Sequence, residues 1–199
     1  MRRDGVEIVT GAAKYGADLS LPGMLVGKVL RSPHAHARIL GIDTSKAEAL
    51  KGVKAVITKD DILDQPSAYV GPARVQQNLH HITRNVMARE KALYEGHAVA
   101  AVAAISTAVA EEALKLIEVN YETLPHATGV AAALEMDAPL LHEEQITLGM
   151  EPAPTKPSNI AKFAEFERGD LDVGFAAADE VVEMEFSTEA VHQGYIEPH

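Results

Sequence analysis

Apolar runs separated by polar breaks divide the first sixty residues into short strands and one helix. Three runs rich in aliphatic and β-branched residues predict strands over Met24–Arg31, Arg38–Asp43 and Val53–Ile57. Ser32-Pro33 separates the first two strands, because a proline disfavours helical backbone in the residue before it. Between the second and third strands, we expect a short helix over Ser45–Leu50, capped by Asp43 or Thr44 and ended by Gly52.

The clearest pattern is a strand–helix–strand unit in the middle of the chain. Residues Ala98–Ile105 are small and apolar at every position, which predicts a fully buried strand, with a buried helix segment as the alternative. Ser106 and Thr107 are N-cap candidates for a helix whose apolar residues fall on one stripe. Residues 117–122 then alternate with period two, which predicts a second strand.

Two stretches lack periodicity. Residues 64–85 are polar and carry two prolines, which predicts a long loop. Residues 145–158 carry three prolines and predict a linker. Between them, Val130–Leu134 is expected to form a short alanine-rich helix.

Beyond the linker, the pattern predicts a second strand–helix–strand piece over Lys162–Arg168, Asp170–Ala178 and Glu180–Thr188. The last of these strands has one apolar face, formed by Val182, Met184 and Phe186. That face would need cover from a neighbouring domain or from a second copy in a homo-oligomer. The overall expectation is an α/β (α+β) fold. It has a compact mixed-sheet domain over the first two-thirds of the chain and the start of a second domain after the linker.

Composition narrows the functional classes. The 199 residues carry a formal net charge of −11, which argues against partners with many phosphates, such as nucleic acid or an anionic membrane surface. There is no cysteine, so the chain has no disulfide, thiolate iron–sulfur cluster or cysteine-ligated zinc. No apolar run approaches the ~18 residues of a membrane span. We expect a cytoplasmic protein.

Nine histidines are the remaining candidates for chemistry. His34 and His36 would point the same way from an extended segment, as a metal pair does, and His80 and His81 are adjacent. No spacing supplies a third ligand, so we predict no metal site and ordinary hydrogen bonds for these rings. The sequence contains no nucleophile elbow, dinucleotide fingerprint or phosphate-binding loop.

A set of segments, in a fixed order, resembles the large subunit of molybdenum hydroxylases, the xanthine dehydrogenase and aldehyde oxidase family. The segments are Gly11–Asp18, Pro22–Leu25, Leu30–Ala37, Ile42–Ser45, Gly52-Val53, Tyr94–Val102, Val119–Pro125, Pro139–His142, Gly169–Phe175 and Glu197-Pro198. The resemblance implies an N-terminal α/β hammerhead domain over residues 1–144. The linker over 145–158 would then lead to the truncated start of a molybdopterin-binding domain over 159–199.

The resemblance also implies a function. Members of this family oxidise or reduce aldehydes, N-heterocycles, aromatic acyl-CoA thioesters or carbon monoxide at a molybdenum–molybdopterin centre, often a cytosine dinucleotide. Iron–sulfur clusters and FAD lie on partner domains or subunits. The chain is expected to be an inactive fragment that holds no cofactor and no catalytic residue of its own and that works with the rest of the large subunit.

Three residues near the terminus are candidates for cofactor contact. Some family members have a glutamine near the molybdenum, at a position aligned with Val191, and Gln193 lies two residues away. On this basis Gln193, Gly194 and Glu197 are the candidate cofactor-binding residues. The alternatives to an enzyme fragment are a self-standing, non-catalytic binding or assembly module of hammerhead fold, and a histidine metal binder.

Overall fold

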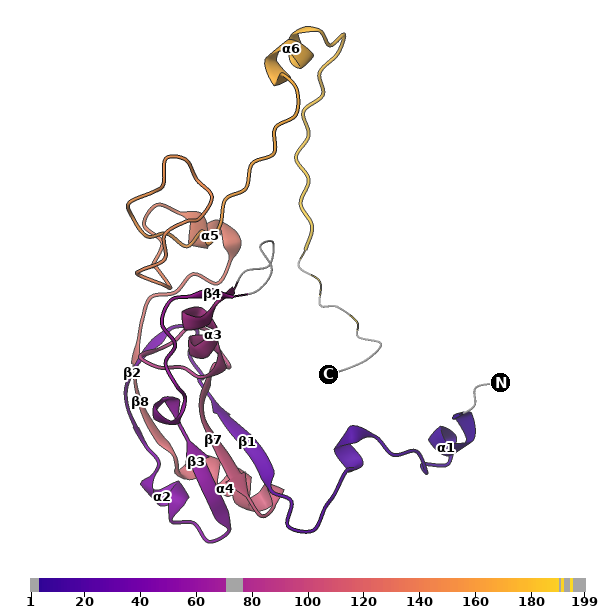
Figure 1. The fold of residues 1–199 in the computed structure, drawn as a ribbon, viewed down its shortest axis with the longest axis vertical. Helices are drawn as coiled ribbons and strands as arrows, with labels where there is room; N and C mark the ends of the chain where they lie inside the picture. The colour runs from indigo at the N-terminus through magenta and orange to yellow at the C-terminus, as the bar shows by residue number, and fades with distance from the viewer. Residues whose placement is uncertain (1–3, 71–76, 190, 192–193, 195–199) are drawn as a thin grey trace.

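A computed structural model describes residues 4–70, 77–189, 191 and 194 of the chain (Figure 1). The helices are α1 (Gly5–Val9), α2 (Ser45–Glu48), α3 (Leu79–Val86), α4 (Thr107–Leu116), α5 (Val130–Leu134) and α6 (Leu171–Ala176), with 3₁₀ turns η1 (Gly16–Asp18) and η2 (Lys59–Asp61). The strands are β1 (Val26–Arg31), β2 (Ala37–Asp43), β3 (Val53–Ile57), β4 (Tyr69–Val70), β5 (Gln77–Asn78), β6 (Lys91–Ala92), β7 (Ala98–Ala104) and β8 (Glu118–Thr123).

The strands form two three-stranded antiparallel sheets, ordered β1-β7-β3 and β6-β2-β8, together with the small pair β4-β5. The α/β class that we expected is therefore confirmed, and the compact domain holds two small antiparallel sheets. The reason lies in β7, whose two edges are both occupied. Because β1 and β3 fill these edges, the chain leaving α4 cannot return to β7. Strand β8 pairs with β2 instead.

The core is built from small aliphatic side chains. Strand β7 is buried along most of its length, which confirms the prediction of a buried strand. Helices α2 and α4 contribute Ala47, Ala110 and Ala113, none of which has exposed surface. Alanine at these points lets the helices approach the sheet closely, so the core is stabilised by close packing of small side chains and not by large ones.

Two local signals in this core act as the sequence predicted. The Ser106 hydroxyl accepts a hydrogen bond from the Val109 amide and caps α4. Gly52 has a φ of +102° after α2, and a Cβ there would come within 3.0 Å of the Ile105 side chain. Only glycine satisfies both the backbone angle and the space.

The predicted loop over residues 64–85 is wrong in part, because these residues include most of α3 and the two short strands β4 and β5. Asn78 caps α3 by accepting a hydrogen bond from the His80 amide. Helix α3 lies under the loops that follow β8, and Figure 1 shows it at the end of the two sheets opposite to α2. The strands β4, β5 and β6 have two residues each and are defined by their partners, so no periodicity marks them in the sequence.

After the body of the fold, residues 26–163, the chain leaves as an extended arm, residues 164–189 (Figure 1). Helix α6 forms as predicted, and the Asp170 carboxylate caps it at 3.0 Å from the Val173 amide. The strands predicted over Lys162–Arg168 and Glu180–Thr188 are wrong, since both stretches are coil apart from one bridge at Lys162. Every residue from 160 to 189 is exposed. A strand forms only when a neighbouring strand pairs with it, and the described residues offer none here.

Residues 145–158, predicted as a linker, contain no helix or strand but carry contacts. The Ser158 amide donates to the Gln145 carbonyl at 3.0 Å, and the Thr147 and Ser158 hydroxyls are 2.7 Å apart. Leu148 also pairs with the chain around Lys162. The segment is thus a closed loop held at its ends, while the division into domains stays a prediction. In the part of the chain that is described, no helix combines the length and apolar character that crossing a membrane requires.

Candidate functional site

Polar chemistry concentrates where α3 meets the loop of residues 139–145. Helix α3 presents His80, His81 and Arg84 toward this loop, which carries His142, Glu143 and Glu144. The loop is anchored from two sides. The Lys91 ammonium of β6 donates to the Leu141 carbonyl at 3.0 Å and pairs with Glu143 at 3.3 Å. This contact from β6 is the first anchor.

Asn159 provides the second anchor of this loop. Its amide nitrogen donates to the carbonyls of Ala133 and Pro139, both at 3.1 Å, and its amide oxygen accepts from the Leu141 backbone at 3.1 Å. One side chain thus joins α5, the loop and the chain after the prolines. Its three hydrogen bonds fix the backbone next to His142.

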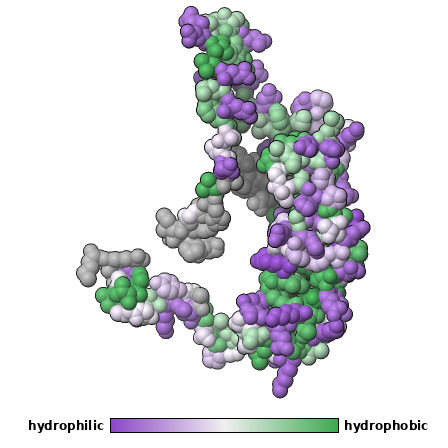
Figure 2. Space-filling view, turned by 180° about the vertical axis from the view of Figure 1, so that it is seen from behind, coloured by the Kyte–Doolittle hydropathy of each residue, from purple (hydrophilic) through white to green (hydrophobic). Residues whose placement is uncertain are grey.

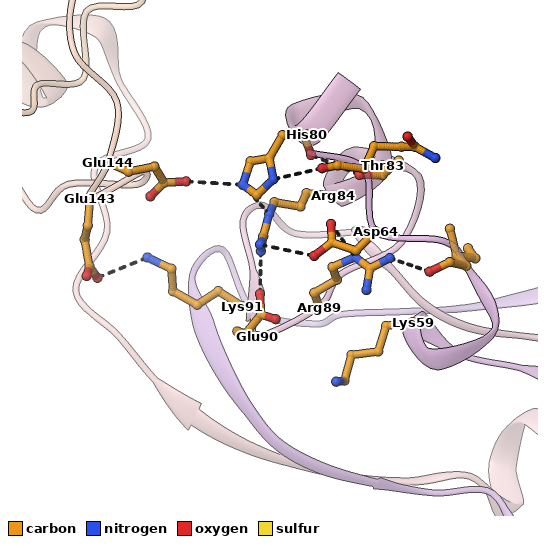
Figure 3. Close-up of polar contacts among 12 residues, drawn as sticks. Lys59, Asp64, His80, Thr83, Arg84, Arg89, Glu90, Lys91, Glu143 and Glu144 are labelled. Atoms are coloured by element: carbon orange, nitrogen blue, oxygen red, sulfur yellow. Dashed lines mark hydrogen bonds and ion pairs between the residues drawn. The ribbon is translucent and has the colours of Figure 1, made fainter. Parts of the chain in front are cut away.

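A charged network surrounds His80 and Arg84 (Figure 3). The Arg84 guanidinium pairs with Glu90, lies 3.8 Å from the Asp64 carboxylate and donates from Nε to His80 Nε2 at 2.8 Å. Burial favours the neutral form of Glu90, but hydrogen bonds from its own backbone amide and from Arg84 outweigh it, and the pKa of Glu90 lies below its ordinary value. The Arg89 side chain adds a further contact with Asp64.

The tautomer of His80 follows from these contacts. Its Nδ1 lies 3.3 Å from the Gln65 carbonyl, which can only accept, so Nδ1 carries the proton. Its Nε2 accepts from Arg84 and has no proton for Glu144, although the two atoms are 3.9 Å apart. The Glu144 carboxylate therefore receives no hydrogen bond from His80.

His81, His142 and Glu144 form a cluster beside this network. One ligand atom from each lies within 4.8 Å of the others, and the two imidazole rings have centroids 5.0 Å apart. Burial lowers the pKa of His142 from its ordinary value, and the charge of His81 lowers it further, while Glu144 opposes the shift. The described residues thus bring together two imidazoles and a carboxylate from segments about sixty residues apart.

The cluster borders a cleft of about 610 Å³ that is lined by four histidines, His36, His81, His126 and His142. His36 is 5% exposed, and its Nδ1 donates to the Pro125 carbonyl at 2.8 Å. The other nitrogen of His36 and Nδ1 of His81 are buried and have no hydrogen-bond partner in the described structure. A second cleft of about 680 Å³ is lined by His80, His81 and Glu144 together with the loop of residues 64–67.

His97 is a structural residue. It is fully buried between β6 and β7, where its Nδ1 accepts from the Leu93 amide at 3.1 Å and its Nε2 donates to the Arg84 carbonyl at 2.8 Å. Its ring stacks on Tyr94 with centroids 4.4 Å apart. Both ring nitrogens are satisfied, so His97 ties the end of α3 to the sheet.

The histidine pair suggested by the sequence does not form a metal pair. His34 packs edge-on against the Tyr121 ring at 4.9 Å, whereas His36 binds the Pro125 carbonyl. His80 makes ordinary hydrogen bonds, as expected. The contribution of His142 could not be found in the sequence, because no local spacing connects it with His81. The pairing arises only when α3 and the loop are brought together.

The three candidate cofactor residues are among the last seven residues of the sequence. Gln193 and Glu197 lie outside the described residues. Gly194 is described, and a Cβ added to it would meet no atom of the described residues within 4 Å. Residues 164–189 of the arm contain nine acidic residues and one basic residue, Arg168. The assignment of Gln193, Gly194 and Glu197 to cofactor contact stays a prediction, and no pterin-binding step is assigned to the described residues.

Comparison with known proteins identifies the family. The sequence model of the protein family described as aldehyde oxidase and xanthine dehydrogenase, a/b hammerhead domain, matches residues 10–125. A probable xanthine dehydrogenase subunit of Bacillus subtilis is 37% identical over 99% of this chain, and the carbon monoxide dehydrogenase large chain of Afipia carboxidovorans is 37% identical over 98%. The matched part is 24% of each of these proteins.

Solved structures agree. The Cu,Mo-containing carbon monoxide dehydrogenase in its carbon monoxide reduced state aligns with 70% of this chain, at 41% identity and a TM-score of 0.58. The aldehyde oxidoreductase of Desulfovibrio desulfuricans aligns with 71%, at 30% identity and a TM-score of 0.60. The aligned part is 17% and 16% of those chains.

The chain therefore belongs to the aldehyde oxidase and xanthine dehydrogenase family, and residues 10–125 match its a/b hammerhead domain. It corresponds to a region of molybdenum hydroxylase large subunits and spans about a quarter of the length of the Bacillus and Afipia relatives.

Proposed function

We propose that this chain is the opening part of a molybdenum hydroxylase large subunit and serves as the scaffold beside the molybdopterin-binding domain. The complete enzyme would be an oxidoreductase acting on an aldehyde, an N-heterocycle, an aromatic acyl-CoA or carbon monoxide. The observation that carries the proposal is the hammerhead match over residues 10–125, in a chain whose Bacillus and Afipia relatives are about four times longer.

The exposed arm supports this role. Three of the four phenylalanines of the chain lie in the arm, Phe166, Phe175 and Phe186; all three are exposed, and Phe166 is 95% exposed. In the space-filling view, hydrophobic surface gathers at the tip formed by α6 (Figure 2). Aromatic side chains normally dominate cores and interfaces. Their exposure here fits an arm that the rest of the large subunit covers, with a second copy of the chain as the other candidate partner.

The cofactor is assigned to the rest of the enzyme. The molybdenum, held by a molybdopterin cytosine dinucleotide, would be bound by the remainder of the large subunit. Iron–sulfur clusters and FAD would lie on partner domains or subunits, as the chain has no cysteine to bind a cluster. We place the assembled enzyme in the cytoplasm. By itself, the chain is expected to turn over no substrate.

The test compares the 199-residue chain with the complete large subunit from the same cells. We expect about one molybdenum per complete subunit, none in the chain, and oxidation of an aldehyde or N-heterocycle with an artificial electron acceptor by the complete subunit only. Oxidation by the purified chain alone would contradict the division of labour. Absence of molybdenum from the complete subunit would contradict the proposed function itself and favour a non-catalytic assembly module.

A further inference from the structure

The cluster of His81, His142 and Glu144 has the composition of a metal site. Two imidazole nitrogens and one carboxylate form a ligand set that proteins use for zinc and other first-row metals, with further positions left to water or substrate. In this chain the three ligand atoms lie within 4.8 Å of one another. Ligands of a tetrahedral zinc ion lie roughly 3.3 Å apart, so small side-chain rotations would close the set.

The state of the side chains suits a cation. Nδ1 of His81 is buried and has no hydrogen-bond partner in the described structure, so no described protein group competes with a metal for it. His80 accepts its bond from Arg84 and leaves the carboxylate of Glu144 free of that ring's proton. The free carboxylate supplies the negative charge that a divalent ion requires.

A second observation concerns the cleft that His81 and His142 also line. His36 is only 5% exposed, lines this same cleft, and keeps Nε2 without a hydrogen-bond partner in the described structure. Because its Nδ1 donates to the Pro125 carbonyl, Nε2 is the unprotonated nitrogen with a free lone pair. Two buried, unpartnered imidazole nitrogens on one cleft are costly unless something binds them.

The backbone around the cluster is already fixed. Asn78 caps α3 at the His80 amide, and Lys91 and Asn159 hold the loop at Leu141. These contacts set the positions of His81 and His142 without using the ligand atoms themselves. Support of this kind lowers the cost of ordering the ligands on binding.

We propose that His81, His142 and Glu144 bind one divalent first-row transition metal ion, represented by Zn²⁺, with a position left open to water. The Lys91 ammonium and the Arg84 guanidinium lie near the site and oppose a cation, but each is paired with its own carboxylate, Glu143 and Glu90. The site is separate from the proposed molybdenum chemistry and does not rest on it.

The experiment uses the untagged, metal-free 199-residue chain and Zn²⁺ in competition with a chromophoric chelator at neutral pH. We expect one equivalent bound with a dissociation constant below about 10 μM. Replacing Zn²⁺ with Co²⁺ gives a visible absorption spectrum that reports the coordination number. Circular dichroism of each variant confirms that it is folded.

Matched variants decide the assignment. Glu144→Gln and His142→Ala should each weaken binding at least about tenfold. Glu112→Gln, which changes an exposed acid of α4 away from the site, should leave binding unchanged, as should His34→Ala. Failure of the wild-type chain to bind Zn²⁺ would overturn the proposal. Binding that survives both Glu144→Gln and His142→Ala would also overturn it, because the ion would then sit on other histidines.

Discussion

The body of the fold and the arm that leaves it treat apolar residues in opposite ways. In the body, residues 26–163, small side chains such as Ala100, Val102 and Ala113 are buried almost completely. In the arm, residues 164–189, Phe166, Phe175 and Phe186 are the largest apolar side chains and all are exposed. The body is stabilised by its own close packing, whereas the arm has apolar surface that its own residues cannot cover.

The difference has an energetic scale. A phenylalanine buries about 150–250 Å² when it is covered. At about 25 cal/mol per Å², covering the three arm phenylalanines completely corresponds to an upper bound of about 20 kcal/mol. That gain is available only to a partner surface. An arm built for cover by another domain and a body that folds without it are consistent with the proposed place of this chain in a larger subunit.

The largest effect should come from breaking the body at His97. His97→Ala removes the acceptor of the Leu93 amide and the donor to the Arg84 carbonyl and leaves a cavity under Tyr94. We expect a loss of about 3 kcal/mol in the free energy of unfolding. Urea unfolding followed by circular dichroism measures it. The exposed His126→Ala is the control and should change little; equal losses in both variants would contradict the structural role of His97.

A smaller loss is expected at the junction of body and arm. Gly149 has a φ of +81°, and a Cβ there would lie 2.3 Å from the Phe163 carbonyl oxygen. Gly149→Ala should therefore open the pairing of Leu148 with Phe163 at a cost of roughly 1–3 kcal/mol. Hydrogen exchange at the Phe163 amide reports the opening directly.

The matched control for that variant is Gly174→Ala within α6, where a Cβ meets no atom and φ is not positive. This substitution should strengthen the helix slightly, because alanine has the higher helix propensity. If exchange at the Phe163 amide were unchanged in Gly149→Ala, the close approach of the Gly149 backbone to Phe163 would be refuted.

Particular residues show how far the sequence leads. The unbroken apolar run of β7 and the cap at Ser106 are local signals, and the structure realises both. The expected strand over Glu180–Thr188 is wrong. Its period-two pattern indicates which face is apolar, but a strand also needs a hydrogen-bonded neighbouring strand, which the sequence pattern does not predict. For the site, His81 was visible as half of an adjacent pair. Its link to His142 depends on Lys91 and Asn159 holding a distant loop, which no spacing encodes.

Acidification should lower the stability of the body through His97. Burial keeps the pKa of His97 below its ordinary value of 6.5, and hydrogen bonds to the Arg84 and Asn85 backbones only partly oppose this. In the unfolded chain the ring takes up a proton near its ordinary pKa, while in the folded body it stays neutral. Its contribution to stability is therefore present above that pH and is lost as the pH falls further.

The measurement compares the free energy of unfolding of the wild-type chain and of His97→Gln between about pH 7.5 and 5.5. The wild-type advantage should shrink below about pH 6.5, by at most about 1.4 kcal/mol per pH unit for one proton. An advantage that stays constant over this range would show that the ring titrates equally in both states.

The smallest effect is expected from removing the arm. A chain that ends at residue 163 keeps the Leu148–Phe163 pairing and all three hydrogen bonds of Asn159. Its free energy of unfolding should match that of the full chain within about 0.5 kcal/mol, because the residues removed bury little against the body. Binding of a hydrophobic dye should fall, since three exposed phenylalanines are lost.

A chain that ends at residue 148 sharpens the boundary. It lacks Asn159 and Ser158, so the loop that carries His142 loses one of its two anchors while β7 and α4 keep their core. We expect it to fold but to be less stable than the chain ending at 163. If the two were equally stable, the predicted linker would be the true domain boundary. If both were unfolded while the full chain is folded, the arm would contribute to the body, and the contrast between the two regions would fail.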